Sequence, residues 1–309
     1  MPQLVILAVI GLAAQFVDGS LGMAYGVTST TLLLASGIAP AAASAAVHLA
    51  EVGTTFVSGV SHWRFRNVDW GVVARIAIPG GIGAFAGATF LSRISTEAGA
   101  PLMAGILFTL GAYILIRFTA RGLPTHRLGQ RVRTRYLTPL GLFAGFVDST
   151  GGGGWGPVAT PSLLASGRME PRKVIGSVDT SEFVVAICAS VGFLIGLGQE
   201  NIPLDIVLAL LIGGVVAAPL AAWVVRHLPA RILGSSVGGV IVLTNAQSLL
   251  EAVGVTGAVV PVVLLTLLAI WIAAIAWSVR AYLAERRERT DAENESASTE
   301  PESRAYAED

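Results

Sequence analysis

Two short segments of the chain combine an acid, hydroxyl groups and glycine, and this combination can bind an anion. FVDGSLGMAYG covers residues 16–26, and FVDSTGGGGWG covers residues 146–156. Because glycine has no Cβ, an oxyanion can approach the backbone amides of such a segment closely. The candidate substrate-binding residues, all in these two segments, are Ser20, Gly22, Ser149, Thr150, Gly151, Gly152, Gly153 and Gly154.

Asp18 and Asp148 stand just before the glycines and have two possible roles. Each can cap the following helix by accepting hydrogen bonds from its first amides, or it can belong to the site itself. Glycines in a membrane protein can also serve close helix packing alone, but the duplicated acid–hydroxyl–glycine pattern favours a site. Since no Lys-Ser or Lys-Thr follows the glycines, the pattern is not a nucleotide-binding phosphate loop.

Four further ionisable residues fall inside apolar segments. Glu51 and Glu182 lie near the middle of their segments, and His48 and Asp179 precede them by three residues on the same helix faces. Ionisable groups at membrane depth are costly and usually line a pathway or a proton relay. These four are therefore the candidates for coupling proton movement to anion movement, and a structural role for His48 is the alternative.

Composition identifies a membrane protein. The chain has 309 residues, of which 53% are hydrophobic and 13% charged. GAVVPVVLLTLLAIWIAAIAW (257–277) alone is long enough to cross a bilayer, and several similar stretches exist. The N-terminus lacks the basic flank of a secretory signal, so we expect it in the mature protein. The single cysteine, Cys188, excludes an intrachain disulfide and a cysteine metal cluster, and we expect no cofactor, metal or nucleic-acid partner.

The two glycine-rich segments belong to an internal duplication. Residues 11–37 align with residues 141–167 at a constant offset of 130, with 14 of 27 positions identical. After a slip of one residue, Pro40 matches Pro171 and Glu51 matches Glu182, while His48 is replaced by Asp179. Asn67 and Asn201 then begin the next apolar segments.

As one continuous helix, the first 30 residues of each copy would be too long for the bilayer. Broken at the glycines, each of the two arms is too short to cross it alone. The arms would be 4–17 and 23–37, then 136–147 and 155–167. Each pair forms either one broken crossing or a re-entrant hairpin. With hairpins, seven crossings remain, at 40–62, 71–92, 100–119, 174–198, 204–226, 231–251 and 256–279, and all of the 20 Lys and Arg except Arg93 fall on one side. The positive-inside rule therefore favours hairpins.

Three crossings in each copy make the copies inverted, an architecture typical of secondary transporters. The predicted fold is an all-α polytopic membrane protein with two inverted repeats, each a Gly-rich re-entrant or broken helix plus three crossings, and one extra C-terminal helix. The predicted divisions are a first repeat (1–120), a basic cytoplasmic loop (121–135), a second repeat (136–253), a final transmembrane helix (254–284) and a disordered polar tail (285–309). The N-terminus would be outside the cell membrane and the tail cytoplasmic.

The paired openings GLAAQFVDGSLGMAYG and GLFAGFVDSTGGGGWGPVATPSLLASG, with GGIGAFAGATFLSRIS (80–95), resemble the TauE/SafE family of sulfite exporters, also called the toluene sulfonate uptake permease family. The resemblance covers roughly residues 4–253. It implies movement of sulfite, sulfonates or related organic anions across the cytoplasmic membrane. The first copy departs from the pattern, with Leu21, Met23 and Ala24 where the second copy has glycines, so its tip is expected to bind substrate less directly.

We therefore predict a secondary transporter of a small sulfur-containing anion, with export as the expected direction and protons as candidate coupling ions. The partners would be the anion, protons and the lipid bilayer, and a homo-oligomer is compatible with the sequence. The alternatives are an anion channel using the same donors and an uptake permease for another organic anion. A membrane enzyme is disfavoured because no histidine-plus-nucleophile arrangement is repeated. A scaffold acting through the charged tail is the remaining alternative.

Overall fold

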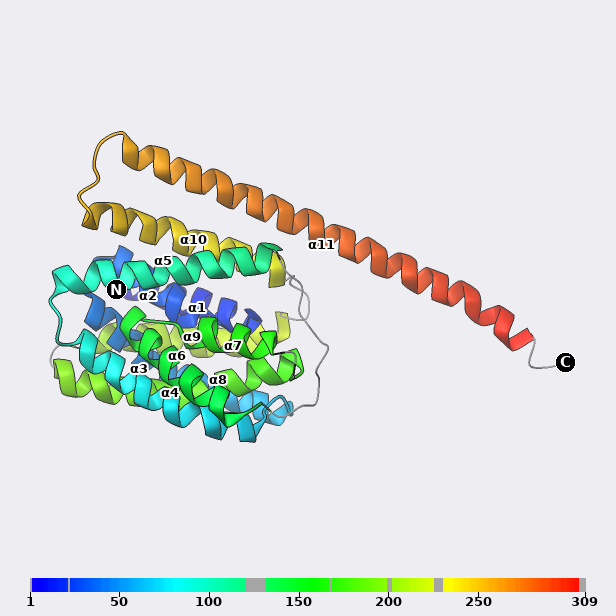
Figure 1. Ribbon diagram of the computed structural model, residues 1–309, viewed down its shortest axis with the longest axis horizontal. Helices are drawn as coiled ribbons and strands as arrows, with labels where there is room; N and C mark the ends of the chain where they lie inside the picture. The colour runs from blue at the N-terminus through cyan, green and yellow to red at the C-terminus, as the bar shows by residue number, and fades with distance from the viewer. Residues whose placement is uncertain are drawn as a thin grey trace.

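The computed structural model describes residues 2–21, 23–120, 132–166, 168–198, 202–224 and 230–305, and every regular element in these ranges is an α-helix (Figure 1). The helices are α1 (Pro2–Leu21), α2 (Tyr25–Ala35), α3 (Pro40–Arg64), α4 (Trp70–Leu91), α5 (Thr96–Ala120), α6 (Thr134–Gly151), α7 (Trp155–Ala165), α8 (Pro171–Leu197), α9 (Leu204–Val224), α10 (Ala230–Ala252) and α11 (Val259–Ala305). The all-α prediction is confirmed.

The seven expected crossings correspond to α3, α4, α5, α8, α9, α10 and α11, each with 21 or more residues. Among the described residues, four helical stretches are both long and apolar enough to cross a membrane: Trp70–Leu91, Thr96–Ala120, Arg172–Leu197 and Val259–Arg287. α3 and α10, with 25 and 23 residues, have the length but carry more polar residues. The chain is therefore a multi-pass membrane protein.

The distribution of side chains is that of a protein surrounded by lipid. Large apolar residues on the outside are strongly exposed, such as Ile78, Ile195 and Leu265, at 65%, 68% and 63%. Polar and ionisable residues, including His48 and Glu51, lie buried in the interior. Because exposed apolar area is unfavourable in water and favourable in hydrocarbon, this arrangement fits a bilayer.

The two halves of the chain exchange their first helices. α1 packs along α9 of the second half, and α6 packs along α4 of the first half. Glycines allow the close approach: a Cβ on Gly141 would lie 2.7 Å from the carbonyl oxygen of Ile76, and Gly11 stands in the same way against Leu210. Gly11 corresponds to Gly141 in the duplication, and Ile76 corresponds to Leu210. The same contact is therefore made once in each half.

α3 and α8, which are equivalent in the duplication, pass each other in opposite directions. The ring of His48 lies 5.9 Å from that of Phe193, and the ring of Phe56 lies 5.7 Å from that of Phe183. Further along α3, His62 lies 3.8 Å from Asp179. As the residue number rises along α3, the number of the partner on α8 falls, so the two helices are antiparallel.

Both glycine-rich segments break their helices, but each first arm runs four residues past its predicted end at 17 or 147. α1 ends at Leu21 and α2 begins at Tyr25, while α6 ends at Gly151 and α7 begins at Trp155. Gly152 and Gly153 have φ angles of 70° and 151°, a region that glycine adopts freely. Ala24 has a φ of 101°, which is costly for a residue with a Cβ.

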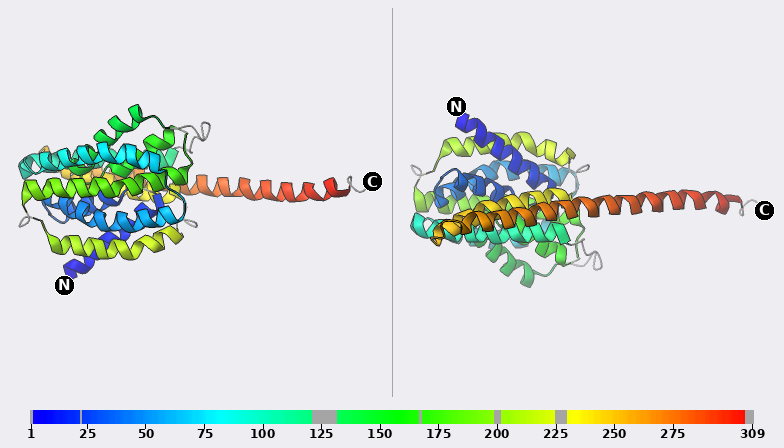
Figure 2. Two further views of the ribbon diagram at one scale, coloured as in Figure 1. Left: turned by 90° about the horizontal axis from the view of Figure 1, so that it is seen from below. Right: turned by 90° about the horizontal axis from the view of Figure 1, so that it is seen from above.

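α11 lies on the outside of the bundle and projects well beyond it (Figures 1 and 2). It is attached to α10, since the indole nitrogen of Trp271 donates to the carbonyl oxygen of Ser235 at 3.1 Å and the hydroxyls of Ser235 and Ser278 lie 2.8 Å apart. The helix runs on to Ala305, through most of the segment expected to be a disordered tail. The difference has a physical reason: alanine, glutamate and arginine, which are frequent there, are strong helix formers.

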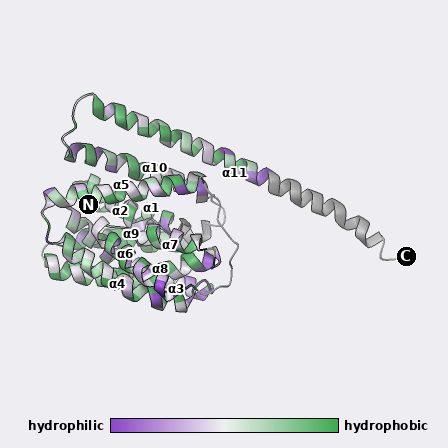
Figure 3. Cartoon of the chain, viewed as in Figure 1, coloured by the Kyte–Doolittle hydropathy of each residue, from purple (hydrophilic) through white to green (hydrophobic). Residues whose placement is uncertain are grey.

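Basic residues concentrate at one end of the bundle. The guanidinium of Arg75, near the start of α4, donates to the carbonyl oxygen of Val132, just before α6, and Thr119 at the end of α5 bonds Ser235 near the start of α10. The amide of Asp69 donates to Ser177, so the end of α3 and the start of α8 share this end too. Hydrophilic residues at this end appear purple in Figure 3.

Candidate functional site

The two helix breaks contact each other inside the bundle. A Cβ on Gly26 would lie 2.7 Å from the Cα of Gly153 and 2.9 Å from a carboxylate oxygen of Glu51. The hydroxyl of Thr30 donates to the carbonyl oxygen of Gly152. Glycine is therefore required at positions 26 and 153 by the close approach of two backbones, in addition to any role in binding.

The amides around the second break are already used within the protein. The Gly152 and Gly153 amides donate to the carbonyl oxygen of Asp148, the latter at 2.8 Å. The Gly154 and Trp155 amides donate to the Asp148 carboxylate at 2.8 and 3.0 Å. The sequence-based expectation of bare amide donors in this segment therefore differs from the structure, because Asp148 caps both the end of α6 and the start of α7.

Asp18 makes the corresponding contact at the first break, where its carboxylate accepts from the Tyr25 amide at 3.2 Å. Both aspartates therefore hold the first amides of the second arm. Of the two other candidates in the first segment, Gly22 lies outside the described residues, and the side chain of Ser20 does too.

Two hydroxyls at the second break are buried without a hydrogen-bond partner. They belong to Ser149 and Thr150, whose exposed fractions are 0% and 1%. The carbonyl oxygen of Ser149 accepts from Ser44 at 2.8 Å, so only its side chain is free to bind. Because an unpaired buried hydroxyl is unfavourable, these two groups are the available donors of the candidate site.

A histidine links the two halves beside these hydroxyls. Nε2 of His48 on α3 lies 3.0 Å from the carboxylate of Asp148 on α6 and 4.0 Å from that of Glu51. Nδ1 of His48 lies 2.8 Å from the carbonyl oxygen of Ser44, one turn earlier. His48 is thus fixed at both ring nitrogens, and both oxygens of Glu51 have no hydrogen-bond partner.

Five carboxyl groups are buried together around the breaks, and we call them the acid cluster: Asp18, Glu51, Asp148, Asp179 and Glu182. If all five were ionised, His48 alone could not balance their charge. Burying several carboxylates together is unfavourable, because like charges repel and each loses its water.

Two contacts around the site, that of Ser44 with His48 and that of His62 with Asp179, were missed by the sequence reasoning. Ser44 precedes His48 by four residues, a spacing that places both on one helix face and could have indicated the contact. Asn245 of α10 donates to the hydroxyl of Thr31 on α2 at 3.1 Å, so it joins two helices. No pattern in the sequence brings His62 to Asp179, because that contact depends on how α3 crosses α8.

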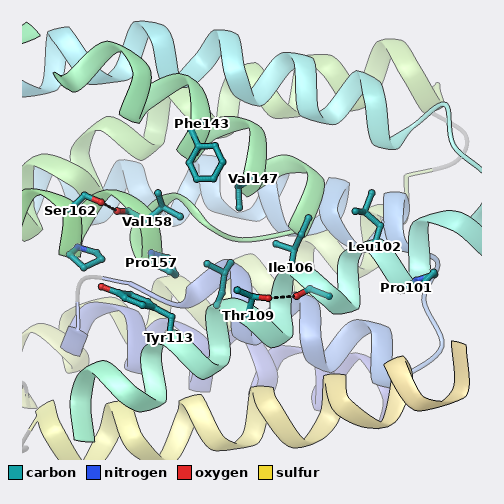
Figure 4. Close-up of a pocket in the computed structure, with 13 residues that line it drawn as sticks. Pro101, Leu102, Ile106, Thr109, Tyr113, Phe143, Val147, Pro157, Val158 and Ser162 are labelled. Carbon is teal, nitrogen blue, oxygen red and sulfur yellow. Dashed lines mark hydrogen bonds between the residues drawn. The ribbon is translucent and has the colours of Figure 1, made fainter. Parts of the chain in front are cut away.

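An apolar cavity of about 690 Å³ lies beside the second break. Figure 4 shows Phe143 and Val147 of α6 on one side and Ile106 and Tyr113 of α5 on the other. A Cβ on Gly151 would lie 2.5 Å from Ile106, so one wall touches the break. The lining residues are Pro101, Leu102, Gly105, Ile106, Thr109, Leu110, Tyr113, Phe143, Val147, Pro157, Val158, Pro161 and Ser162.

This arrangement, with two broken helices meeting among buried acids in a multi-pass helical bundle, is that of a membrane transporter. The family model of Sulfite exporter TauE/SafE matches residues 7–248, and the chain belongs to this family. It is 50% identical over 276 residues to the Probable membrane transporter protein YtnM of Bacillus subtilis (strain 168), a match covering 89% of this chain and 92% of that protein. No solved structure matches the chain.

Proposed function

We propose that the protein is a proton-linked carrier of a small sulfur-containing anion, sulfite or an organosulfonate. The observation that supports this best is the pair of unpartnered buried hydroxyls, Ser149 and Thr150, in the last turn of α6 beside the second break. Hydroxyl groups can donate to the oxygens of a sulfite or sulfonate group. The amides of residues 152–155 would become further donors only if Asp148 moved.

Proton linkage follows from the charge around this junction. An anion cannot enter a region that already holds several ionised carboxylates, because like charges repel strongly in a low dielectric. Protons on Glu51 and Glu182 would remove part of that charge and favour the anion. Lower pH on the side where the anion binds should therefore strengthen its binding, and proton and anion should bind together.

The carrier cycle we propose uses two inverted halves. The antiparallel crossing of the equivalent helices α3 and α8 supports inversion, and the breaks would be the tips of re-entrant hairpins. The end of the bundle rich in Arg and Lys would face the cytoplasm. Export is the proposed direction, on the family's description as exporters.

The test is transport by the purified protein in liposomes, with pH set separately on each side. Methanesulfonate is the better first substrate, because it keeps its charge throughout the assay range, whereas sulfite takes up a proton within it. We expect saturable transport whose KM falls as the pH on the loading side is lowered. Radiolabelled sulfite, measured next, would rank the two anions.

The matched variants are Ser149→Ala and Thr150→Val against Thr89→Val, whose hydroxyl bonds its own helix at Phe85. Since a hydrogen bond to a charged group contributes about 1.5–3 kcal/mol, each site variant should raise KM about tenfold or more, and Thr89→Val should not. Non-saturating flux without exchange would indicate the rival function, an anion channel. A pH-independent KM would refute proton linkage.

A further inference from the structure

Where α3 crosses α8, two equivalent buried side chains, His48 and Asp179, each lie next to an aromatic ring of the other helix. His48 and Asp179 are equivalent in the duplication, and the same offset of 131 makes His62 equivalent to Phe193. The ring of Phe193 covers His48 at 5.9 Å, and the ring of His62 stands over Asp179 at 3.8 Å. One buried group is therefore covered by an inert ring and the other by a ring that can carry a proton.

The two covering residues also differ in their access to water. Phe193 is fully buried, whereas the side chain of His62 is 24% exposed. The acid cluster itself reaches at most 9% exposure, at Glu182. His62 is thus a partly exposed titratable side chain that lies next to Asp179, a member of the buried acid cluster.

The carboxyl oxygen that faces His62 is free to accept a proton, because Oδ2 of Asp179 has no hydrogen-bond partner. The separation of 3.8 Å between Nε2 of His62 and Oδ2 of Asp179 exceeds a hydrogen bond, and a small movement or one bridging water would close it. Asp18 and Asp179 are both buried members of the acid cluster.

The other charged groups at this end of α3 are already paired or point to the outside. Asp69 caps α4 through the Val72 amide at 3.1 Å, and Arg172 pairs with Glu170 at 2.7 Å. Charged side chains around this end, among the residues that the structure describes, include Arg64, Arg66, Asp69, Arg75, Arg117, Arg133, Arg135, Arg168, Glu170, Arg172, Lys173 and Asp179, while His48 and Glu51 lie further along α3. Asp179 is the one that faces His62.

We propose that His62 is the port through which protons reach the acid cluster from the basic end of the bundle, an inference that rests on the proposed proton linkage. A protonated His62 gives its proton from Nε2 to Oδ2 of Asp179, so an N–H bond breaks and an O–H bond forms. Water at the bundle end then reprotonates the neutral imidazole. Asp179 shares the proton with Asp18, and Phe193 closes the equivalent path on the other side.

The experiment uses the full chain in liposomes, with infrared absorption of protonated carboxyl groups followed after a pH jump. This signal reports the acid cluster without any substrate. His62→Phe, which copies the residue of the other half, should slow the response about tenfold or more, as expected when a general acid–base group is removed. His62→Gln keeps a polar side chain of similar size and should slow it equally if the port needs a titrating group.

The control is Trp63→Phe, a neighbour on the same turn that is 59% exposed on the outer surface and should leave the response unchanged. Transport is the second measurement: His62→Phe should lose the pH dependence of methanesulfonate transport but keep anion exchange at equal pH. An unchanged carboxyl response in both His62 variants overturns the proposal, as does a wild-type cluster that does not respond to pH. A slowed response in a protein that moves neither anion would uphold the port and refute the proposed function.

Discussion

The first half of the molecule, α1–α5, and the second, α6–α10, descend from one sequence pattern but hold their breaks differently. Asp148 accepts from two amides and bonds a histidine, while Asp18 accepts from one amide and faces a second acid, Asp179. The second arm of the first break, α2, is bonded to α10 through Thr31 and Asn245. The second arm of the other break, α7, borders the apolar cavity beside α5.

The duplication explains how this difference arose. With the offset of 134 that relates Asn67 to Asn201, Asn245 corresponds to Gly111, and with the offset of 130 Thr31 corresponds to Pro161. Neither Gly111 nor Pro161 has a side chain that can form the bond that joins α10 to α2. The comparison teaches that α2 is bonded directly to α10, whereas an apolar cavity lies between α7 and α5.

The largest effect is expected at the aspartates. Asp148→Ala leaves the Gly154 and Trp155 amides and His48 without their partner, so it should destabilise the protein by about 3–5 kcal/mol. Asp18→Ala removes one capping bond and should cost about 0.5–2 kcal/mol. Thermal unfolding of the two purified variants measures the difference. Equal losses would contradict the asymmetry of the two breaks.

A smaller effect on stability should distinguish α5 from α10, the equivalent helices that follow in the two halves. Gly105 and Gly239 are equivalent, but a Cβ on Gly105 meets only Leu249 at 4.0 Å, whereas one on Gly239 would collide with the ring of Trp271 on α11. Gly105→Ala should stabilise by about 0.5–1 kcal/mol through the lower entropy of the unfolded chain, and Gly239→Ala should destabilise by about 1–3 kcal/mol. Unfolding midpoints that move in the same direction would refute this contrast.

The smallest effect concerns the bond between Asn245 and Thr31. A double-mutant cycle of Thr31→Val and Asn245→Leu should give a coupling energy of about 0.6–1.7 kcal/mol, the range for polar contacts between membrane helices. The matched control cycle pairs Thr31→Val with Thr266→Val, since Thr266 bonds its own helix at Val262 and should give no coupling. A coupling near zero for the first pair would show that this bond does not contribute to holding α2 against α10.

The sequence predicted the helices well because hydrophobic length and glycine punctuation are local signals. The presence of both breaks and the start of α3 at Pro40 could be read from it, whereas α8 begins at Pro171, three residues before its predicted crossing at 174–198. The hydrogen bonds from the amides of the second break to Asp148 could not be predicted, because nothing in the sequence shows that the amides and this carboxylate bond each other. Contacts between halves, such as His48 with Asp148 and His62 with Asp179, depend on crossing geometry, which local patterns do not encode.

The helical course of residues 285–305 was missed for a different reason. A polar composition low in apolar residues indicates a segment that cannot build a core, and this segment does extend beyond the bundle (Figure 2). Helix formation needs no core when the chain continues from a helix that already exists, because the costly first turn has been made. Composition therefore indicated a segment without a core of its own, but it did not indicate that the backbone is helical as far as Ala305.

The exchange of α1 and α6 between the halves sets a timetable for the synthesis of the protein. The neighbour along which α1 packs, α9, begins at Leu204, about 190 residues after the middle of α1. At usual translation rates the ribosome needs roughly 10–40 s to make that stretch. During this interval α1 waits in the membrane with its packing face uncovered, so a chain interrupted before α9 leaves an orphan helix that quality-control proteases can recognise.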